Sequence, residues 1–153
     1  MNAKVLLVDD DASVVAALSG VLGSEGYDVI QAFDGHEALQ KFQAAGGADI
    51  VLLDLNMPIK AGWDTFERLT AINPLLPIII ITARPDQYPL AVAAGAAALM
   101  DKPLDIPSLL ETMGKLLAEP LGARLARIAG RNPHTLHLET SGTTPESSRG
   151  DAR

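Results

Sequence analysis

The hydrophobic pattern of this chain alternates between two kinds of segment. Short, almost continuous apolar runs rich in β-branched residues predict buried strands. The longer stretches between them, several with apolar residues spaced near 3.6, predict helices. The predicted strands are Val5–Val8, Val29–Ala32, Ile50–Leu53, Ile78–Ile81 and Ala97–Met100, and the predicted helices are Ser13–Leu22, His36–Ala44, Trp63–Ile72, Gln87–Ala94 and Ile106–Leu117.

The order of these segments predicts the fold class. A run such as Ile78–Ile81 has no polar side, so its strand must be buried on both faces, as in a parallel sheet covered by helices. Strands that alternate with helices connect by right-handed crossovers. We therefore expect an α/β fold, a doubly wound five-stranded parallel sheet with helices on both faces. Asp11 and Asp34 stand where they could cap the first two helices.

The pattern changes after Leu117, which sets the expected domain boundary. We expect residues 1–118 to form one domain and residues 119–153 to form an appendage. Within the appendage, Leu121–Ile128 could form a short helix. Residues 132–153 are mostly Thr, Ser, Gly, Pro and charged residues without a periodic apolar side, so we expect a flexible, largely disordered tail.

Composition excludes several classes of protein. The chain has 153 residues, of which 48% are hydrophobic, and no cysteine, so disulfides, thiolate metal sites and cysteine nucleophiles are absent. A net charge of −7 argues against direct binding of nucleic acid. The apolar run after Met1 is too short for a signal peptide, and no run is long enough for membrane insertion. We expect a cytoplasmic protein.

Polar and charged residues follow the predicted strands at the points where the strands end. Asp9 and Asp10 follow the first strand, Asp54 the third, Thr82 the fourth and Lys102 the fifth. In open α/β sheets these strand ends converge and carry the ligand site. Three carboxylates gathered there would repel one another unless a cation lay among them. Mg²⁺ prefers oxygen ligands and would relieve this repulsion.

This constellation suits a carboxylate that attacks phosphorus. Such a nucleophile needs its charge neutralised and needs donors that hold the phosphoryl oxygens. Mg²⁺, Lys102 and the Thr82 hydroxyl would supply both to Asp54. Taken singly, these residues have plainer interpretations. Asp9 and Asp10 could be helix caps, Asp54 could begin a turn, and Thr82 could be an ordinary strand residue. Together they favour the phosphoryl chemistry.

Four motifs carry a resemblance to a known family. They are Leu7–Asp11, Asp54–Pro58 followed by Gly62, Thr82-Ala83, and Lys102-Pro103. Across roughly residues 3–118 the sequence resembles the response-regulator receiver domain of two-component signalling. The resemblance implies the flavodoxin-like strand order 2-1-3-4-5. It also implies a cis peptide bond between Lys102 and Pro103.

The resemblance assigns a role to each residue of the site. Asp54 would be the phosphoryl acceptor, assisted by Lys102 and Thr82. Mg²⁺ would be bound by Asp9, Asp10, Asp54 and the backbone carbonyl of Asn56. The phosphoryl group would come from the phosphohistidine of a histidine kinase or a histidine phosphotransfer protein. The protein would not be an enzyme with an external product, because it would catalyse only its own phosphorylation and dephosphorylation.

Residues 119–153 offer no room for an output domain, so we expect the signal to pass to a protein partner that the sequence does not name. Two other functions stay open. A phosphatase of the haloacid dehalogenase type also uses an aspartyl nucleophile, but it needs a second Asp where this chain has Asn56. The other function is a receiver-like interaction module that signals without phosphorylation. The chain keeps all the residues that the phosphoryl chemistry would use, which argues against this function.

Three positions depart from the family pattern without touching the chemistry. Ala61 stands where an acidic residue often precedes the loop glycine. Leu99 stands where many members carry Tyr or Phe, and Leu104 stands where an aromatic residue is common. The changes at Leu99 and Leu104 predict a different output mechanism.

Overall fold

The computed structural model describes residues 2–55, 59–84, 88–128 and 136–138. The strands in chain order are β1 (Lys4–Val8), β2 (Asp28–Ala32), β3 (Ile50–Asp54), β4 (Ile78–Thr82), β5 (Ala98–Asp101) and β6 (Leu136–Leu138). The helices are α1 (Ala12–Ser24), α2 (Gly35–Ala44), α3 (Ile59–Ile72), α4 (Tyr88–Ala94), α5 (Ile106–Leu117) and α6 (Leu121–Ile128).

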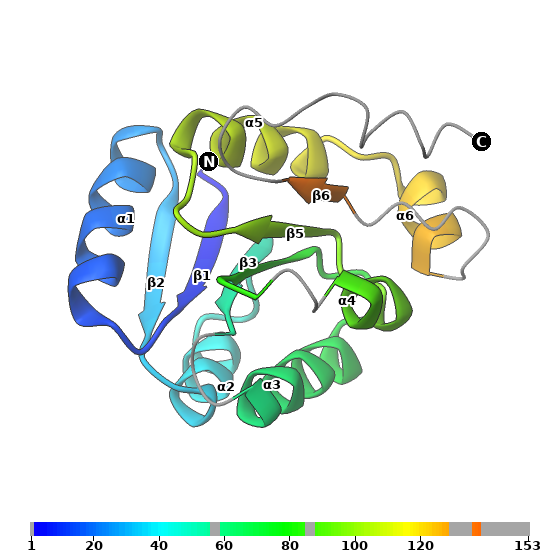
Figure 1. Ribbon diagram of the computed structural model, residues 1–153, viewed down its shortest axis with the longest axis horizontal. Coiled ribbons are helices and arrows are strands. Elements are labelled where there is room, and N and C mark those ends of the chain that lie inside the picture. Colours follow the sequence, from blue (N-terminus) through cyan, green and yellow to red (C-terminus); the bar gives the residue numbers. More distant parts are fainter. Residues whose placement is uncertain (1, 56–58, 85–87, 129–135, 139–153) are drawn as a thin grey trace.

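The strands form one parallel sheet in the order β2-β1-β3-β4-β5-β6. The doubly wound α/β fold and the order 2-1-3-4-5 are therefore confirmed. Figure 1 shows the sheet between two layers of helices, with α1 and α5 on one face and α2, α3 and α4 on the other. The sequence did not predict the sixth strand, which adds to the outer edge of β5.

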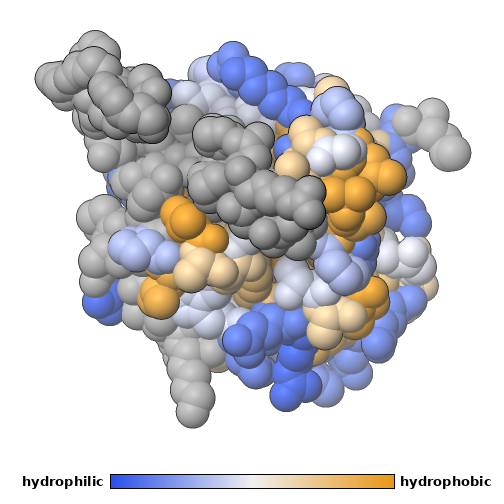
Figure 2. All heavy atoms as spheres, turned by 90° about the vertical axis from the view of Figure 1, so that its right-hand side faces the viewer, coloured by the Kyte–Doolittle hydropathy of each residue, from blue (hydrophilic) through white to orange (hydrophobic). Residues whose placement is uncertain are grey.

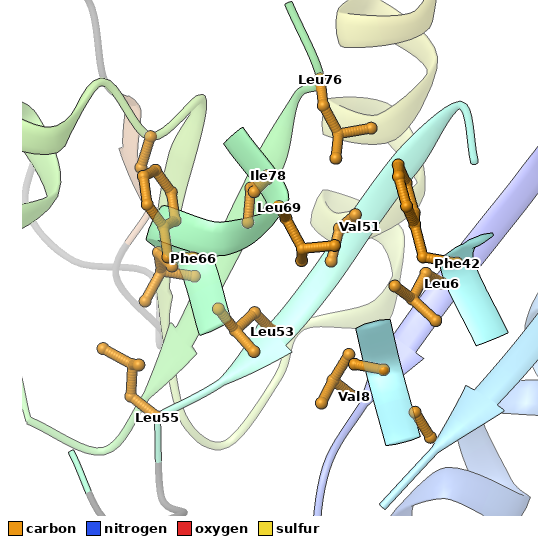
Figure 3. Packing of buried hydrophobic residues seen from close by; sticks show 14 of the residues in the cluster. Leu6, Val8, Phe42, Val51, Leu53, Leu55, Phe66, Leu69, Leu76 and Ile78 are labelled. Atoms are coloured by element: carbon orange, nitrogen blue, oxygen red, sulfur yellow. The ribbon is translucent and has the colours of Figure 1, made fainter. Parts of the chain in front are cut away.

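Each face of the sheet has its own apolar core. On one face, Phe42 of α2 and Phe66 and Leu69 of α3 pack against strand residues such as Leu53. Figure 3 shows these side chains filling the space between the strands and the helices. On the other face, α1 and α5 contribute Leu22 and Met113. β3 and β4 are buried at every residue because both faces of the sheet are covered.

Aspartate caps fix where the first two helices begin. An Asp11 carboxylate oxygen accepts hydrogen bonds from the backbone N–H groups of Ser13 and Val14, at 3.0 and 3.4 Å. Asp34 accepts a hydrogen bond from the backbone N–H of Glu37 at 2.8 Å. Both predicted caps are confirmed. With Asp11 as its cap, α1 begins at Ala12, so Asp9 and Asp10 lie in the short turn between β1 and α1.

The C-terminal segment differs from the sequence-based expectation. α6 lies where a short helix was expected, but Leu136–Leu138 forms β6 within the part expected to lack regular structure. The expectation that residues 132–153 are largely disordered stays a prediction. A Leu-His-Leu run is too short to show a periodic signal, and its pairing is supplied by the otherwise open edge of β5. Residues 129–135 and 139–153 lie outside the described residues, and the domain boundary near residue 118 stays a prediction.

Within the described ranges, no helix has both the length and the apolar character needed to cross a membrane.

Candidate functional site

Three carboxylates meet at the carboxyl ends of β1 and β3. Asp9 and Asp10 follow β1 directly, and Asp54 is the last residue of β3. One carboxylate oxygen from each of the three lies within 4.8 Å of the other two. Asp9 and Asp54 are only 3% and 2% exposed, whereas Asp10 is exposed. The predicted convergence of these residues is confirmed, and the cluster opens to solvent through Asp10.

Lys102 joins this cluster from the end of β5. Its Nζ donates a hydrogen bond to Oδ2 of Asp54 at 2.7 Å, which also makes an ion pair. The backbone N–H of Lys102 donates to the carbonyl of Thr82 at 3.0 Å, so the lysine is anchored to β4. The expected cis bond between Lys102 and Pro103 is present. The sequence placed these residues at one edge, and the structure brings Lys102 into direct contact with Asp54.

Thr82 ends β4, the strand next to Asp54. Asp54 is paired in register with Ile81, and Thr82 is the next residue along β4. Thr82 is 1% exposed, and its hydroxyl oxygen accepts a hydrogen bond from the backbone N–H of Arg84 at 2.9 Å. Sequence reasoning missed this role of Arg84. The spacing of Thr82 and Arg84, typical of a hydroxyl turn, was the signal that could have shown it.

The electrostatics of the cluster centre on Asp9. Burial, which disfavours its charged form, raises the pKa of Asp9 to about 7, and the hydrogen bond and negative charge of Asp54 add to this. The backbone N–H of Asp11, which donates to Asp9 Oδ1 at 2.9 Å, and the Lys102 charge work in the opposite direction. One ammonium group therefore does not balance the negative charge of the site.

The donor set suits a hard divalent cation. Two buried carboxylates and one exposed carboxylate offer oxygen ligands that lie within 4.8 Å of one another, and the exposed side leaves room for water. A cation bound there would favour the charged form of Asp9, which burial disfavours. Asn56, whose carbonyl was the fourth predicted ligand, lies outside the described residues. The residues present fit Mg²⁺.

Comparison with known proteins identifies the family. The model of the response regulator receiver domain matches residues 5–113 of this chain. The chain belongs to this family. It is 39% identical over 116 residues to the transcriptional regulatory protein ZraR of Salmonella typhimurium, and 37% identical over 105 residues to the alkaline phosphatase synthesis transcriptional regulatory protein PhoP of Bacillus subtilis. The matched regions cover 74% and 67% of this chain but only 26% and 43% of those two proteins.

Solved receiver domains share the fold. The chemotaxis protein CheY4 of Vibrio cholerae superposes with a TM-score of 0.69 at 33% identity, and the match covers 76% of this chain and 99% of CheY4. The response regulator TrrA of Thermotoga maritima, solved in complex with Mg²⁺ and a beryllium fluoride, gives a TM-score of 0.67 at 30% identity, covering 76% and 99% of the two chains. This chain is thus a receiver domain followed by a further segment.

Proposed function

We propose that this receiver is a phosphorelay response regulator that accepts a phosphoryl group on Asp54 in a Mg²⁺-dependent reaction. The donor is the phosphohistidine of a histidine kinase or of a histidine phosphotransfer protein. The supporting observation is the 2.7 Å contact between Lys102 Nζ and the Asp54 carboxylate, made inside a cluster of three carboxylates. The intact set of residues around Asp54 is the combination that phosphoryl transfer to a carboxylate requires.

The protein's own residues account for the acceptor side of the reaction. A carboxylate oxygen of Asp54 attacks phosphorus, the phosphorus–nitrogen bond breaks, and the electron pair stays on the imidazole nitrogen of the donor. The product is an acyl phosphate on Asp54. The Lys102 ammonium would neutralise negative charge beside the attacking carboxylate, and the Thr82 hydroxyl, at the end of the adjacent strand, would donate to a phosphoryl oxygen.

Asp9, Asp10, Asp54 and the carbonyl of Asn56 would hold Mg²⁺. When bound, the ion supplies charge neutralisation on the phosphoryl oxygens. The raised pKa of Asp9 supports this assignment, because the cluster carries more negative charge than Lys102 balances. The comparison with TrrA supports the same chemistry, since that relative was solved with Mg²⁺ and a beryllium fluoride.

The protein would act in the cytoplasm and signal through protein contacts. Its turnover is limited to its own phosphorylation and dephosphorylation, so it is a signalling phosphoprotein rather than an enzyme with an external product. Direct contact with nucleic acid is disfavoured by the net charge of −7. The downstream target is a protein that recognises the change around Asp54.

Mass spectrometry after incubation with Mg²⁺ and acetyl phosphate tests the proposal. The wild-type protein should gain one phosphoryl group, Asp54→Asn should gain none, and Asp64→Asn should behave as wild type. Asp64 is a suitable control because it is an exposed carboxylate that pairs only with its helical neighbour Arg68 among the ion pairs of the described residues. Labelling of Asp54→Asn would refute the acceptor assignment. No labelling of wild type would favour the interaction module, and repeated hydrolysis of a phosphate monoester would favour the phosphatase.

A further inference from the structure

The C-terminal strap, made of α6 and β6, lies beyond the receiver domain. The family model ends at residue 113, so the strap is an addition to the receiver. It returns to the domain and touches it at two places, at the end of α5 and along the edge of β5. A segment that folds back onto its own domain covers surface that would otherwise be open to another molecule.

The first attachment is Arg124 of α6. Its Nη2 donates a hydrogen bond at 3.2 Å to the carbonyl of Leu116 in the last turn of α5, and this carbonyl also accepts from the backbone N–H of Glu119 at 3.2 Å. Its Nε lies 3.5 Å from a carboxylate oxygen of Glu119. A cation at the carboxyl end of a helix also interacts favourably with the helix dipole. Arg124 thus links α6 to the carboxyl end of α5.

The second attachment is the pairing of β6 with β5. Leu136, His137 and Leu138 lie opposite Ala98, Leu99 and Met100 in a parallel ladder. Without β6, β5 would be the outer strand, and its backbone N–H and C=O groups would be open to pairing with another chain. β6 therefore pairs with backbone groups of β5 that could otherwise pair with another extended segment.

The contacts of α6 and β6 with the receiver domain contribute little stability. The ladder is only three residues long, at the short end of the usual range of strand lengths. Leu121 and Leu125 of α6 stay 58% and 47% exposed, so the helix buries little of its apolar side. Figure 2, which views the molecule from the side of α4 and α6, shows separate hydrophobic patches on this face. Elements with short ladders and little apolar burial open locally at low free-energy cost.

We propose that the C-terminal strap is an autoinhibitory cover and that the edge of β5 is a docking surface for an extended segment of a partner protein. The partner would add a strand to β5 through backbone hydrogen bonds, in the place that β6 occupies in the closed state. The chain's own Leu136–Leu138 shows which ligand fits, a short extended segment with apolar residues at alternate positions. This proposal does not depend on phosphoryl transfer to Asp54.

Backbone pairing can be tested in the full-length chain. Successive N–H groups of a strand point to opposite sides, so proline at two adjacent positions must remove a donor directed at β5. The test variant is Leu136→Pro with His137→Pro. The control is Leu136→Ala with His137→Ala, which also removes both side chains but keeps both N–H groups. The probe is a fluorescent peptide with the sequence of residues 134–140, and binding is measured by anisotropy.

The proline variant should bind the peptide at least ~10-fold more tightly than wild type, because its edge is open in every molecule whereas the wild-type edge is open in a minor fraction. The affinity of the alanine variant for the peptide should stay closer to that of wild type. Equal affinity in all three proteins, or no binding to the proline variant, would overturn the proposal.

Amide hydrogen exchange in the wild-type chain provides a second measurement that does not require the variant to fold. Amide protons in the β5–β6 ladder should exchange much faster than those in the β3–β4 ladder, because the strap opens while the domain stays folded. If both ladders exchanged at the rate set by global unfolding, the strap would not be a cover that opens.

Discussion

Replacing Lys102 with methionine should destabilise the protein in a pH-dependent way. Lys102 Nζ and Asp54 Oδ2 are 2.7 Å apart, and at an effective dielectric constant near 20 two unit charges at that distance attract by about 6 kcal/mol. The cost of desolvating both groups offsets much of this, and breaking a buried pair typically costs about 3–5 kcal/mol. Methionine keeps most of the length of the lysine side chain, so the change mainly removes charge.

Proton uptake by Asp9 should reduce the loss of stability in the Lys102→Met variant. Lys102 lowers the pKa of Asp9, which burial has raised to about 7, so removing Lys102 raises this pKa further. A carboxyl group whose folded-state pKa is raised contributes stability at low pH that is lost as pH rises through that pKa. The loss in the variant should therefore be larger at pH 8 than at pH 6. We expect the variant to lose roughly 2 kcal/mol of unfolding free energy at pH 8 without divalent ions. This loss is smaller than for a buried pair whose remaining carboxylate cannot take up a proton.

Urea unfolding at both pH values measures this effect. Lys115→Met is the matched control, because Lys115 and Glu111 form a pair at 3.5 Å whose side chains are both 68% exposed, and such pairs contribute little. The loss caused by Lys102→Met should also shrink when it is introduced into the Asp54→Asn protein, since the partner charge is gone. An equal loss in both backgrounds, or a larger loss at pH 6, would refute the electrostatic explanation.

Two further predictions concern the metal and the packing of α2. Mg²⁺ should raise the melting temperature more at pH 8 than at pH 6, because at pH 6 it must displace a proton from Asp9; equal shifts at both pH values would count against the assigned ligands. Gly35→Ala should cost about 1–3 kcal/mol in urea unfolding, because a Cβ there would overlap the hydroxyl of Thr65, which is 3% exposed. Gly20→Ala, whose Cβ would meet nothing within 4 Å, should instead stabilise α1; a loss there equal to that at Gly35 would refute the packing argument.

The strands were predicted closely because their signal is the burial of continuous apolar runs. The third strand was expected at Ile50–Leu53 and is found at Ile50–Asp54. The third helix was predicted less well, since it begins at Ile59 rather than at Trp63. Glycine has a low helix propensity, but Gly62 is needed inside the helix, where a Cβ would lie 2.5 Å from Leu55 Cδ2. Tertiary packing overrode the local preference.

The residues of the site were predictable because strand order alone brings the ends of β1, β3, β4 and β5 together. The contacts between these residues could not be predicted from the sequence. That Lys102 bonds Asp54 directly, and that burial holds the pKa of Asp9 near 7, depends on side-chain positions that no sequence pattern encodes. β6 was missed for a related reason. Its three residues have little strand signal of their own, and they pair because β5 presents an open edge.

β5 is the element that the site and the strap share. Its carboxyl end leads into Lys102, and its second residue, Leu99, is fully buried and pairs in register with Ile80 of β4 and His137 of β6. A buried leucine gains little by changing rotamer, and it cannot make the large change of surface that an aromatic side chain would make at this position. We therefore expect a change at Asp54 to reach the outer edge of the sheet by displacing the backbone of β5, through Lys102. Since β6 is bonded to that same backbone, we expect the occupancy of the edge to respond to the state of the site, while the packing of Leu99 stays the same.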